Sequence, residues 1–249
     1  MRSVIGSVCL ACCVAGPSRA QTPRVELDHV YMVVPPGGVK EIDALRSAGF
    51  TIGSPQKHEG EGTTSVAAMF ENAYVELMWL DSAVSVTSEH AAAVEQFRQM
   101  AAWRVSKRSP FGLGLRRLPG DTSHFAFPIT REPAPWIDAN AAYEILNQPA
   151  DSLAVDVFVV PSGAAVPNWI ERLRKRAPQR LQHPGGGREI TSVRVFGPVE
   201  QQPRTVGLVR PARIETRTAS EPLLEIYIDG GGRKSRTDLR PTLPIVVVR

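Results

Sequence analysis

The sequence predicts an α+β domain in which repeated β-α-β-β-β modules form a cupped mixed sheet. Three observations support this fold class. Short apolar runs rich in β-branched residues outnumber the stretches with helical spacing. A compact β-α-β-β-β unit occupies residues 25–80. The pattern that opens this unit returns near residue 190, and self-similarity of this kind indicates an internal repeat.

The first unit is defined by turn signals between its apolar runs. Pro35–Gly38 ends the opening strand, and Gly49 closes a stretch whose apolar residues recur at helical spacing. A loop of polar residues and glycines separates the short second strand from the last two strands, which a tight turn joins. The expected elements are strands at 25–34, 50–52, 63–70 and 73–80, a helix at 39–48 and a polar loop at 54–62.

The middle of the chain is less regular, and the repeat follows it. Ile190–Phe196 aligns with Leu27–Val33, and Leu223–Asp229 aligns with Tyr74–Leu80. We therefore expect these segments to form equivalent halves of one sheet system. In the middle we expect helices at 89–105 and 166–176 and strands at 111–115, 124–129 and 153–160. The expected organisation is a signal peptide at 1–20, the first module and irregular middle at 21–180, a shortened second repeat at 181–230, and a tail with an edge strand at 231–249.

The first 20 residues have the features of a secretory signal peptide. Arg2 precedes an apolar stretch at 4–16, and the small residues Ser18 and Ala20 stand at −3 and −1 of a cut after residue 20. The stretch is too short to span a bilayer permanently. We therefore expect a periplasmic or secreted protein whose mature chain begins at Gln21, with no permanent membrane span.

The cysteines limit the chemistry of the mature chain. Cys9, Cys12 and Cys13 all lie in the leader, so the mature protein would have no disulfide and no thiolate ligand. A lipid anchor on Cys12 or Cys13 is the alternative, although neither position fits the lipidation pattern fully. Loss of the leader removes two arginines and lowers the formal net charge from +4 to +2. This near-neutral charge gives no indication of a nucleic-acid partner.

Two glutamates stand inside apolar strands. Glu76 and Glu225 each lie between two apolar residues and occupy equivalent positions in the aligned segments. Burial of a carboxylate costs several kcal/mol unless it is paired or binds a metal. Strand alternation places His29 and Glu76 on faces that converge if both line one concave sheet. A solvent-facing glutamate on a half-exposed strand is the alternative interpretation.

The motifs around these residues resemble a known superfamily. Leu27-Asp-His-Val30 and Tyr74-Val-Glu-Leu77 look like the vicinal oxygen chelate module, whose fold is also described as glyoxalase/bleomycin-resistance-like. Segments 58–63, 111–117 and 183–188 are similar to the glyoxalase-like domain family. In the superfamily each β-α-β-β-β unit gives one histidine and one glutamate to a divalent metal. The resemblance covers residues 25–230.

The resemblance implies that His29, Glu76 and Glu225 are metal ligands. The superfamily's fourth ligand would be a histidine at the position of Ser192, so the sequence departs from the pattern there. His183 is the best substitute, because its glycine-rich loop leads directly into the repeated strand. A set of histidines and carboxylates suits Zn²⁺, Ni²⁺, Mn²⁺ or Fe²⁺.

Other assignments of the remaining histidines stay open. His124, at the head of an apolar run, follows His183 as a candidate ligand. For both of them, the competing interpretation is a loop or strand-end histidine that binds no metal.

The implied function is that of a divalent-metal-dependent enzyme acting on a small oxygen-rich organic molecule. The metal would act as a Lewis acid in an isomerase, lyase or dioxygenase reaction. Glu76 or Glu225 would serve as the proton-transfer base. His58 would cover the bound substrate, and Arg116 or Arg117 would pair with a substrate carboxylate.

A different functional class remains as the alternative. The same cup without metal would make a non-catalytic small-molecule-binding protein, and Ser192 favours that interpretation. Monomer and homodimer both stay open.

Overall fold

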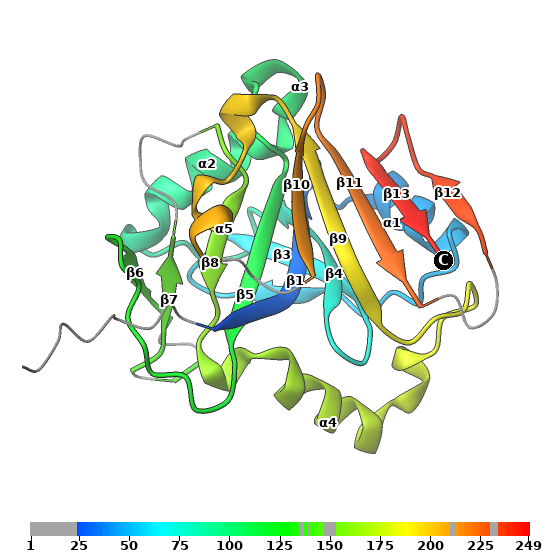
Figure 1. Cartoon of the computed structure of the whole chain (residues 1–249), viewed down its shortest axis with the longest axis horizontal. Helices are drawn as coiled ribbons and strands as arrows, with labels where there is room; N and C mark the ends of the chain where they lie inside the picture. Colours follow the sequence, from blue (N-terminus) through cyan, green and yellow to red (C-terminus); the bar gives the residue numbers. More distant parts are fainter. Residues whose placement is uncertain (1–23, 135–136, 139, 147–152, 210–212, 230–233) are drawn as a thin grey trace, which may run out of the picture.

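The computed structural model describes residues 24–134, 137–138, 140–146, 153–209, 213–229 and 234–249 (Figure 1). The expected signal peptide therefore lies outside the described residues. Within the described ranges, no helix has the length and apolar character needed to cross a membrane.

The first sheet contains eight strands in the order β2-β3-β4-β1-β5-β8-β7-β6, and it curls around one side of the molecule (Figure 1). Its strands are β1 (Val25–Val33), β2 (Gln56–His58), β3 (Thr63–Met69), β4 (Tyr74–Leu80), β5 (Phe111–Arg117), β6 (Thr130–Pro133), β7 (Ala142–Ile145) and β8 (Asp156–Val159).

The strand order is symmetric about the central β1–β5 pair. β1 and β5 are antiparallel, and each is flanked by a parallel partner, β4 or β8. From the outer edge to the centre, one half has the order β2-β3-β4-β1 and the other the order β6-β7-β8-β5. Each half thus has its second, third, fourth and first strand in the same sequence. The expected α+β class with a curled mixed sheet is therefore confirmed, and the internal symmetry of strand order relates the segments 25–80 and 111–159.

The second sheet contains five strands in the order β10-β9-β11-β13-β12. Its strands are β9 (Ile190–Gly197), β10 (Ile214–Thr218), β11 (Leu223–Ile228), β12 (Arg236–Asp238) and β13 (Ile245–Val248). The expected equivalence of 27–80 and 190–229 is wrong, because β9 and β11 are antiparallel whereas β1 and β4 are parallel. Alternation of apolar residues is shared by both segments, but it specifies which face a side chain takes and not which strand is the neighbour.

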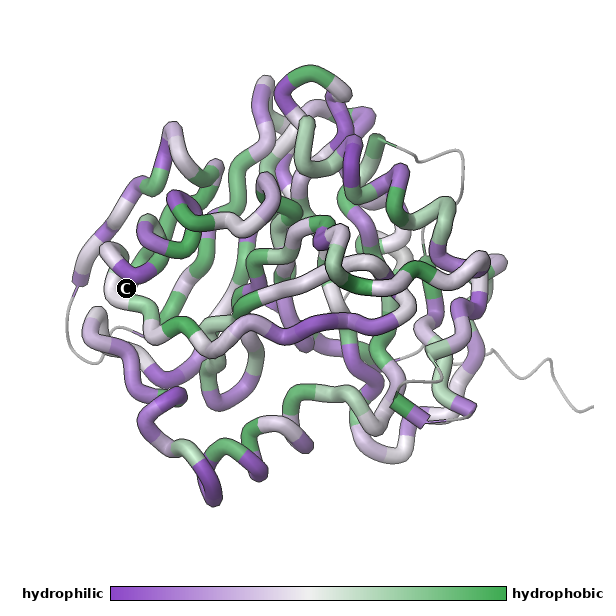
Figure 2. The backbone as a smooth tube through the Cα atoms, turned by 180° about the vertical axis from the view of Figure 1, so that it is seen from behind, coloured by the Kyte–Doolittle hydropathy of each residue, from purple (hydrophilic) through white to green (hydrophobic). Residues whose placement is uncertain are grey.

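Helices pack against the sheets, and α2 contacts the central strands β1 and β4. They are α1 (Val39–Ser47), α2 (Ala91–Ala101), α3 (Trp103–Ser106), α4 (Val166–Arg176) and α5 (Arg204–Val209), with short 3-10 turns η1 (Ser88–His90), η3 (Ser162–Ala164), η4 (Pro178–Leu181) and η5 (Val199–Gln201). Figure 2 shows α4, at the bottom of the view, alternating between hydrophobic and hydrophilic residues, as a helix with one packed face does.

One apolar core joins the two sheets. Val30 and Leu77 of the first sheet belong to the same cluster of buried residues as Val195, Leu224 and Ile226 of the second. A smaller cluster lies on the opposite face of the first sheet, beneath α2. The first sheet therefore has one face packed on the second sheet and another face free to carry polar side chains.

Some expected elements are displaced. Residues 50–52 form no strand, and the backbone N–H of Thr51 donates to Nδ1 of His183 and not to a neighbouring strand. The short strand β2 forms instead inside the expected polar loop, where it pairs with β3. The expected strand at 124–129 is also wrong: its apolar side chains pack onto the core without strand pairing, and β6 begins immediately after them.

Candidate functional site

Four central strands direct side chains onto the concave face, which is the face of the first sheet turned away from the second sheet. The register pairs Tyr31 with Glu76 and His29 with Gly114. Directly opposed residues of neighbouring strands share a face of the sheet. His29, Tyr31 and Glu76 therefore gather on the concave face, where α2 packs over Tyr31 through Met100.

His29 is held between two carboxylates. Its Nδ1 lies 2.9 Å from Oδ1 of Asp28, and its Nε2 lies 4.0 Å from Oε2 of Glu76. Asp28 is fully buried, and its Oδ2 accepts a hydrogen bond from the backbone N–H of Val166 at 2.8 Å. A carboxylate can only accept, so Nδ1 of His29 donates to Asp28, and Nε2 is the ring nitrogen on the side of Glu76.

The strand next to His29 has glycines where side chains would collide with the site. A Cβ on Gly114 would lie 2.2 Å from Cε1 of His29, and one on Gly112 would lie 1.9 Å from Cε1 of Tyr31. The opposite side of the His29 ring stacks on Tyr74, with ring centroids 4.4 Å apart. The spacing Gly-Leu-Gly in β5 therefore provides the surface on which both rings rest.

Substitution of Gly114 by alanine should displace His29. Because the added methyl group cannot share the space of the imidazole, we expect changed NMR chemical shifts of the His29 ring and a loss of about 1–3 kcal/mol of stability. Gly207→Ala is the matched control, since a Cβ there meets nothing within 4 Å. Unaltered chemical shifts of the His29 ring in Gly114→Ala would contradict this role of the glycine.

Asp156 of β8 forms hydrogen bonds and an ion pair with other residues of the protein. The hydroxyl of Tyr31 donates to its Oδ2 at 2.8 Å, Nη2 of Arg108 lies 3.1 Å from its Oδ1, and Gln96 also donates to it. Burial raises the pKa of Asp156, an effect that Arg108 opposes. Burial, followed by Asp156, also raises the pKa of Tyr31 well above its usual value. Asp156 thus anchors Tyr31.

Glu61 brings a further carboxyl group to the concave face. Its side chain is only 15% exposed, and its Oε2 lies 3.6 Å from Nδ1 of His58. Burial, followed by the charges of Glu76 and Glu132, raises the pKa of Glu61 to about 8. Glu61 therefore carries a proton at neutral pH. Sequence reasoning singles out His58 in this loop and misses Glu61, whose flanking glycines, Gly60 and Gly62, were the available signal.

His58 itself is held among hydroxyl groups. Its Nδ1 lies 3.0 Å from Oγ1 of Thr63, and its Nε2 lies 3.2 Å from Oγ of Ser65. Both partners are on β3, so His58 lies beside the concave face at the edge of the sheet. A role against a bound substrate stays a prediction for this residue.

The structure does not bring Glu225 to His29 and Glu76. Glu225 lies on β11 of the second sheet, and the side chains before and after it point into the shared core. Its carboxylate accepts hydrogen bonds from the Tyr227 hydroxyl at 2.7 Å and from Arg236 at 2.9 Å. Burial raises the pKa of Glu225, but these partners outweigh it and lower the pKa below its usual value. Arginines and a tyrosine compensate this carboxylate.

His183 lies in the core, where both of its ring nitrogens have backbone partners. Its Nδ1 accepts a hydrogen bond from the backbone N–H of Thr51 at 3.0 Å, and its Nε2 lies 3.1 Å from the carbonyl oxygen of Met69. The ring packs on Phe70, with centroids 4.1 Å apart. Burial lowers the pKa of His183. With one nitrogen accepting and the other donating, the ring has no lone pair left for a metal.

The remaining expected residues are not part of the group formed by His29, Tyr31 and Glu76. The two arginines expected to bind a substrate carboxylate form ion pairs within the protein. Arg116 pairs with Glu26 at 2.8 Å, and Arg117 pairs with Glu144 at 2.8 Å. His124 is exposed, and Ser192 lies half-buried on β9 of the second sheet.

Two of the expected ligands can reach one ion. The 4.0 Å between Nε2 of His29 and Oε2 of Glu76 fits two ligands of one cation, because metal–ligand distances of about 2.0–2.2 Å allow separations up to about 4.4 Å. Among the described residues, no group of three or more histidine, cysteine, aspartate or glutamate side chains is arranged to hold a metal ion. The described residues therefore offer one cation two ligands, His29 and Glu76.

Comparison with known proteins identifies no family. No protein-family model matches the chain, and no curated protein matches it. Among solved structures, the chain is similar to the crystal structure of a hypothetical protein from Staphylococcus aureus, with 8% sequence identity and a TM-score of 0.49 over 90% of this chain and 98% of that chain. A likeness at this level carries no functional argument.

Proposed function

We propose that the concave face is the small-molecule site of a divalent-metal-dependent enzyme of the glyoxalase-like, vicinal oxygen chelate type. The observation that carries the proposal is the alignment of Asp28, His29 and Glu76. Metal-ligating histidines commonly donate their second ring N–H to a carboxylate, which orients the ring and raises its basicity. Asp28 has this relation to His29, and Glu76 stands where a second ligand is needed.

The symmetric strand order supports the same proposal. In the vicinal oxygen chelate layout, the first and fourth strands of two modules line the cup, and here β1, β4, β5 and β8 lie together at the centre of the sheet. The second half departs from that pattern. Gly114 on β5 has no side chain to offer, and Asp156 on β8 is bound by Tyr31 and Arg108. A metal at His29 and Glu76 would thus keep positions for water or substrate oxygens.

The chain's own residues suit proton transfer. A bound metal would supply Lewis-acid polarisation of a substrate oxygen. Burial, followed by the charge of the nearby Glu76, raises the pKa of Glu61, which makes this carboxyl group a candidate proton donor. These features favour an isomerase or lyase reaction. The rings of Tyr74 and Phe158 pack against the His29 ring and would keep water away from it.

A non-catalytic binding protein is the second candidate. The observation that favours it is the composition of the second half of the cup, where Gly112, Gly114 and the Tyr31–Asp156 hydrogen bond stand in place of ligands. The same aromatic walls would then hold an organic molecule without a metal.

Metal titration distinguishes the two functions. We expect one Zn²⁺ or Mn²⁺ per chain by calorimetry, with affinity lowered at least about 100-fold by His29→Ala or Glu76→Gln and about 10- to 100-fold by Asp28→Asn. Glu225→Gln is the matched control, because that carboxylate lies on the other sheet and should leave the affinity unchanged. If the wild-type protein and His29→Ala bound the metal with equal affinity, the metal site would be rejected. The non-catalytic binding protein would then remain as the candidate function.

A further inference from the structure

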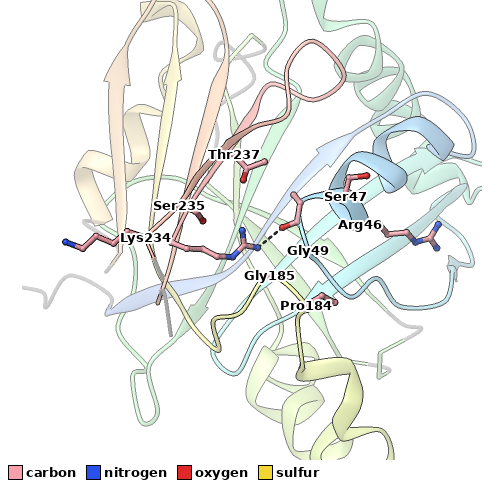
Figure 3. Close-up of a pocket in the computed structure, with 10 residues that line it drawn as sticks. Arg46, Ser47, Gly49, Pro184, Gly185, Lys234, Ser235 and Thr237 are labelled. Atoms are coloured by element: carbon pink, nitrogen blue, oxygen red, sulfur yellow. Dashed lines mark hydrogen bonds between the residues drawn. The ribbon is translucent and has the colours of Figure 1, made fainter. Parts of the chain in front are cut away.

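Two cavities lie away from the concave face, and they differ in character. The larger, of about 690 Å³, lies beside the end of α1 (Figure 3). In Figure 3 the side chains of Arg46 and Lys234 extend away from its centre, and its lining includes no aromatic residue. This cavity has cations but no aromatic wall.

The smaller cavity has both cationic and aromatic residues in its lining. Its volume is about 420 Å³, within the range of about 300–1,000 Å³ that is usual for small-ligand sites. It lies where α3 and η5 meet the loops of the second sheet. Pro222 and Pro244 are buried in its floor, and the half-buried ring of Trp103 forms one wall. Ring-shaped apolar groups thus line the interior of the cavity.

The rim of this cavity is cationic. Arg104, Lys107 and Arg240 line it and are exposed, and Glu221 is the acidic residue among the lining side chains. Arg240 is engaged by both carboxylate oxygens of Asp238. The side chains of Arg104 and Lys107 are held more loosely.

Arg104 and Lys107 keep donors for an anion. Nη2 of Arg104 donates to the carbonyl oxygen of Pro241 at 2.8 Å, and its guanidinium lies 4.2 Å from the centroid of the Trp103 ring. Nζ of Lys107 reaches the carbonyl oxygen of Arg104 at 3.5 Å, the limit of a hydrogen bond. A guanidinium offers five N–H donors and an ammonium three, so both side chains can bind a further acceptor at the mouth of the cavity.

A buried amide supports the wall of the cavity. Gln201 is only 4% exposed, and its Nε2 donates to the carbonyl oxygen of Lys107 at 2.7 Å. This hydrogen bond holds the backbone that carries the Lys107 side chain.

We infer that this cavity binds a small organic anion built on a flat ring, of the aromatic carboxylate class. The ring would lie against Trp103 and the prolines, and the carboxylate would face Lys107 and Arg104. This inference does not depend on the proposed function of the concave face, because the two sites share no residue.

The test compares 2-naphthoate with 2-naphthamide, which has the same ring but no charge, by ligand-observed NMR and calorimetry on the full chain. We expect the anion to bind about 5- to 10-fold more tightly. Lys107→Asn should reduce that preference; asparagine tolerates the positive φ of 66° found at this position. Trp103→Ala should weaken both compounds about 10-fold, which corresponds to about 1.4 kcal/mol.

Matched controls come from the same chain. Lys234→Asn removes a lysine from the larger cavity, and Trp169→Ala removes an exposed tryptophan on α4. Both variants, and His29→Ala, should bind 2-naphthoate as the wild-type protein does. Equal binding of the two compounds, an unchanged affinity in Lys107→Asn, or the absence of saturable binding would each overturn the inference. Lys107 is exposed, so its substitution tests the site even if Trp103→Ala fails to fold.

Discussion

Replacement of Glu61 by glutamine is expected to increase the free energy of unfolding above pH 8 by on the order of 3–5 kcal/mol. Burial, followed by Glu76 and Glu132, raises the pKa of Glu61 from 4.5 to about 8. In the unfolded chain the carboxyl loses its proton near pH 4.5, whereas in the folded protein it keeps the proton until about pH 8. The folded state therefore loses stability as the pH rises through this window, and glutamine avoids the loss.

The measurement is urea unfolding of the metal-free protein at pH 4.5, 6.5 and 8.5. The stabilities of the wild-type protein and Glu61→Gln should be similar at pH 4.5 and diverge as the pH rises. Glu171→Gln is the control, because its side chain is 69% exposed and pairs with Lys175 at the surface. If the Glu61→Gln and wild-type stabilities follow parallel pH profiles, Glu61 does not hold its proton at neutral pH.

Replacement of Arg116 by methionine is expected to destabilise the fold by about 3–5 kcal/mol. Its guanidinium donates twice to Oε1 of Glu26, at 2.8 and 3.0 Å, and to the carbonyl oxygens of Leu27 and Asn72, both at 2.9 Å. It also lies 3.7 Å from the buried carboxylate of Asp28. Methionine fills much of the volume but leaves the acidic groups and both carbonyl oxygens without this partner.

Arg46→Met is the matched control for this substitution. Its side chain is 59% exposed, and its pair with Asp43 lies on the surface of α1, so removal should cost less than about 1 kcal/mol. Thermal and urea unfolding of both variants provide the comparison. Similar losses in the two variants would show that Arg116 is dispensable for the fold and would return it to the candidate substrate-binding residues.

Local pattern predicted a large part of the architecture. Helical spacing at 166–176 corresponds to α4, and the apolar runs at 63–70, 73–80 and 190–196 correspond to β3, β4 and β9. Strand alternation also indicated that His29 and Glu76 face one concavity, and the structure places their side chains 4.0 Å apart. These features depend on residues near one another in the chain or on the two-residue period of a strand, which the amino-acid order determines directly.

The tertiary structure decided which strands became neighbours. β1 has β5 beside it, so Gly112 and Gly114, and not the residues near 190, lie next to the rings of Tyr31 and His29. Glu225 has the same local pattern as Glu76, yet its strand joined the other sheet and its charge is compensated by Arg236. Strand pairing between distant segments depends on the packing of the whole core and on the entropy of closing the intervening loops, and neither is encoded in a short sequence window.

The same reason accounts for the surroundings of His183 and Glu61. The glycine-rich loop made His183 a reasonable ligand, but the packing of Phe50 and Phe70 around its ring gave it two backbone partners. Glu61 lies in a loop whose composition indicates only a turn, and its raised pKa depends on burial and then on Glu76 and Glu132, which other strands bring close. The sequence by itself determined the chemical groups and the faces of their strands, whereas the assembled sheets decided which groups share a site, because burial and charge act between residues that only folding brings together.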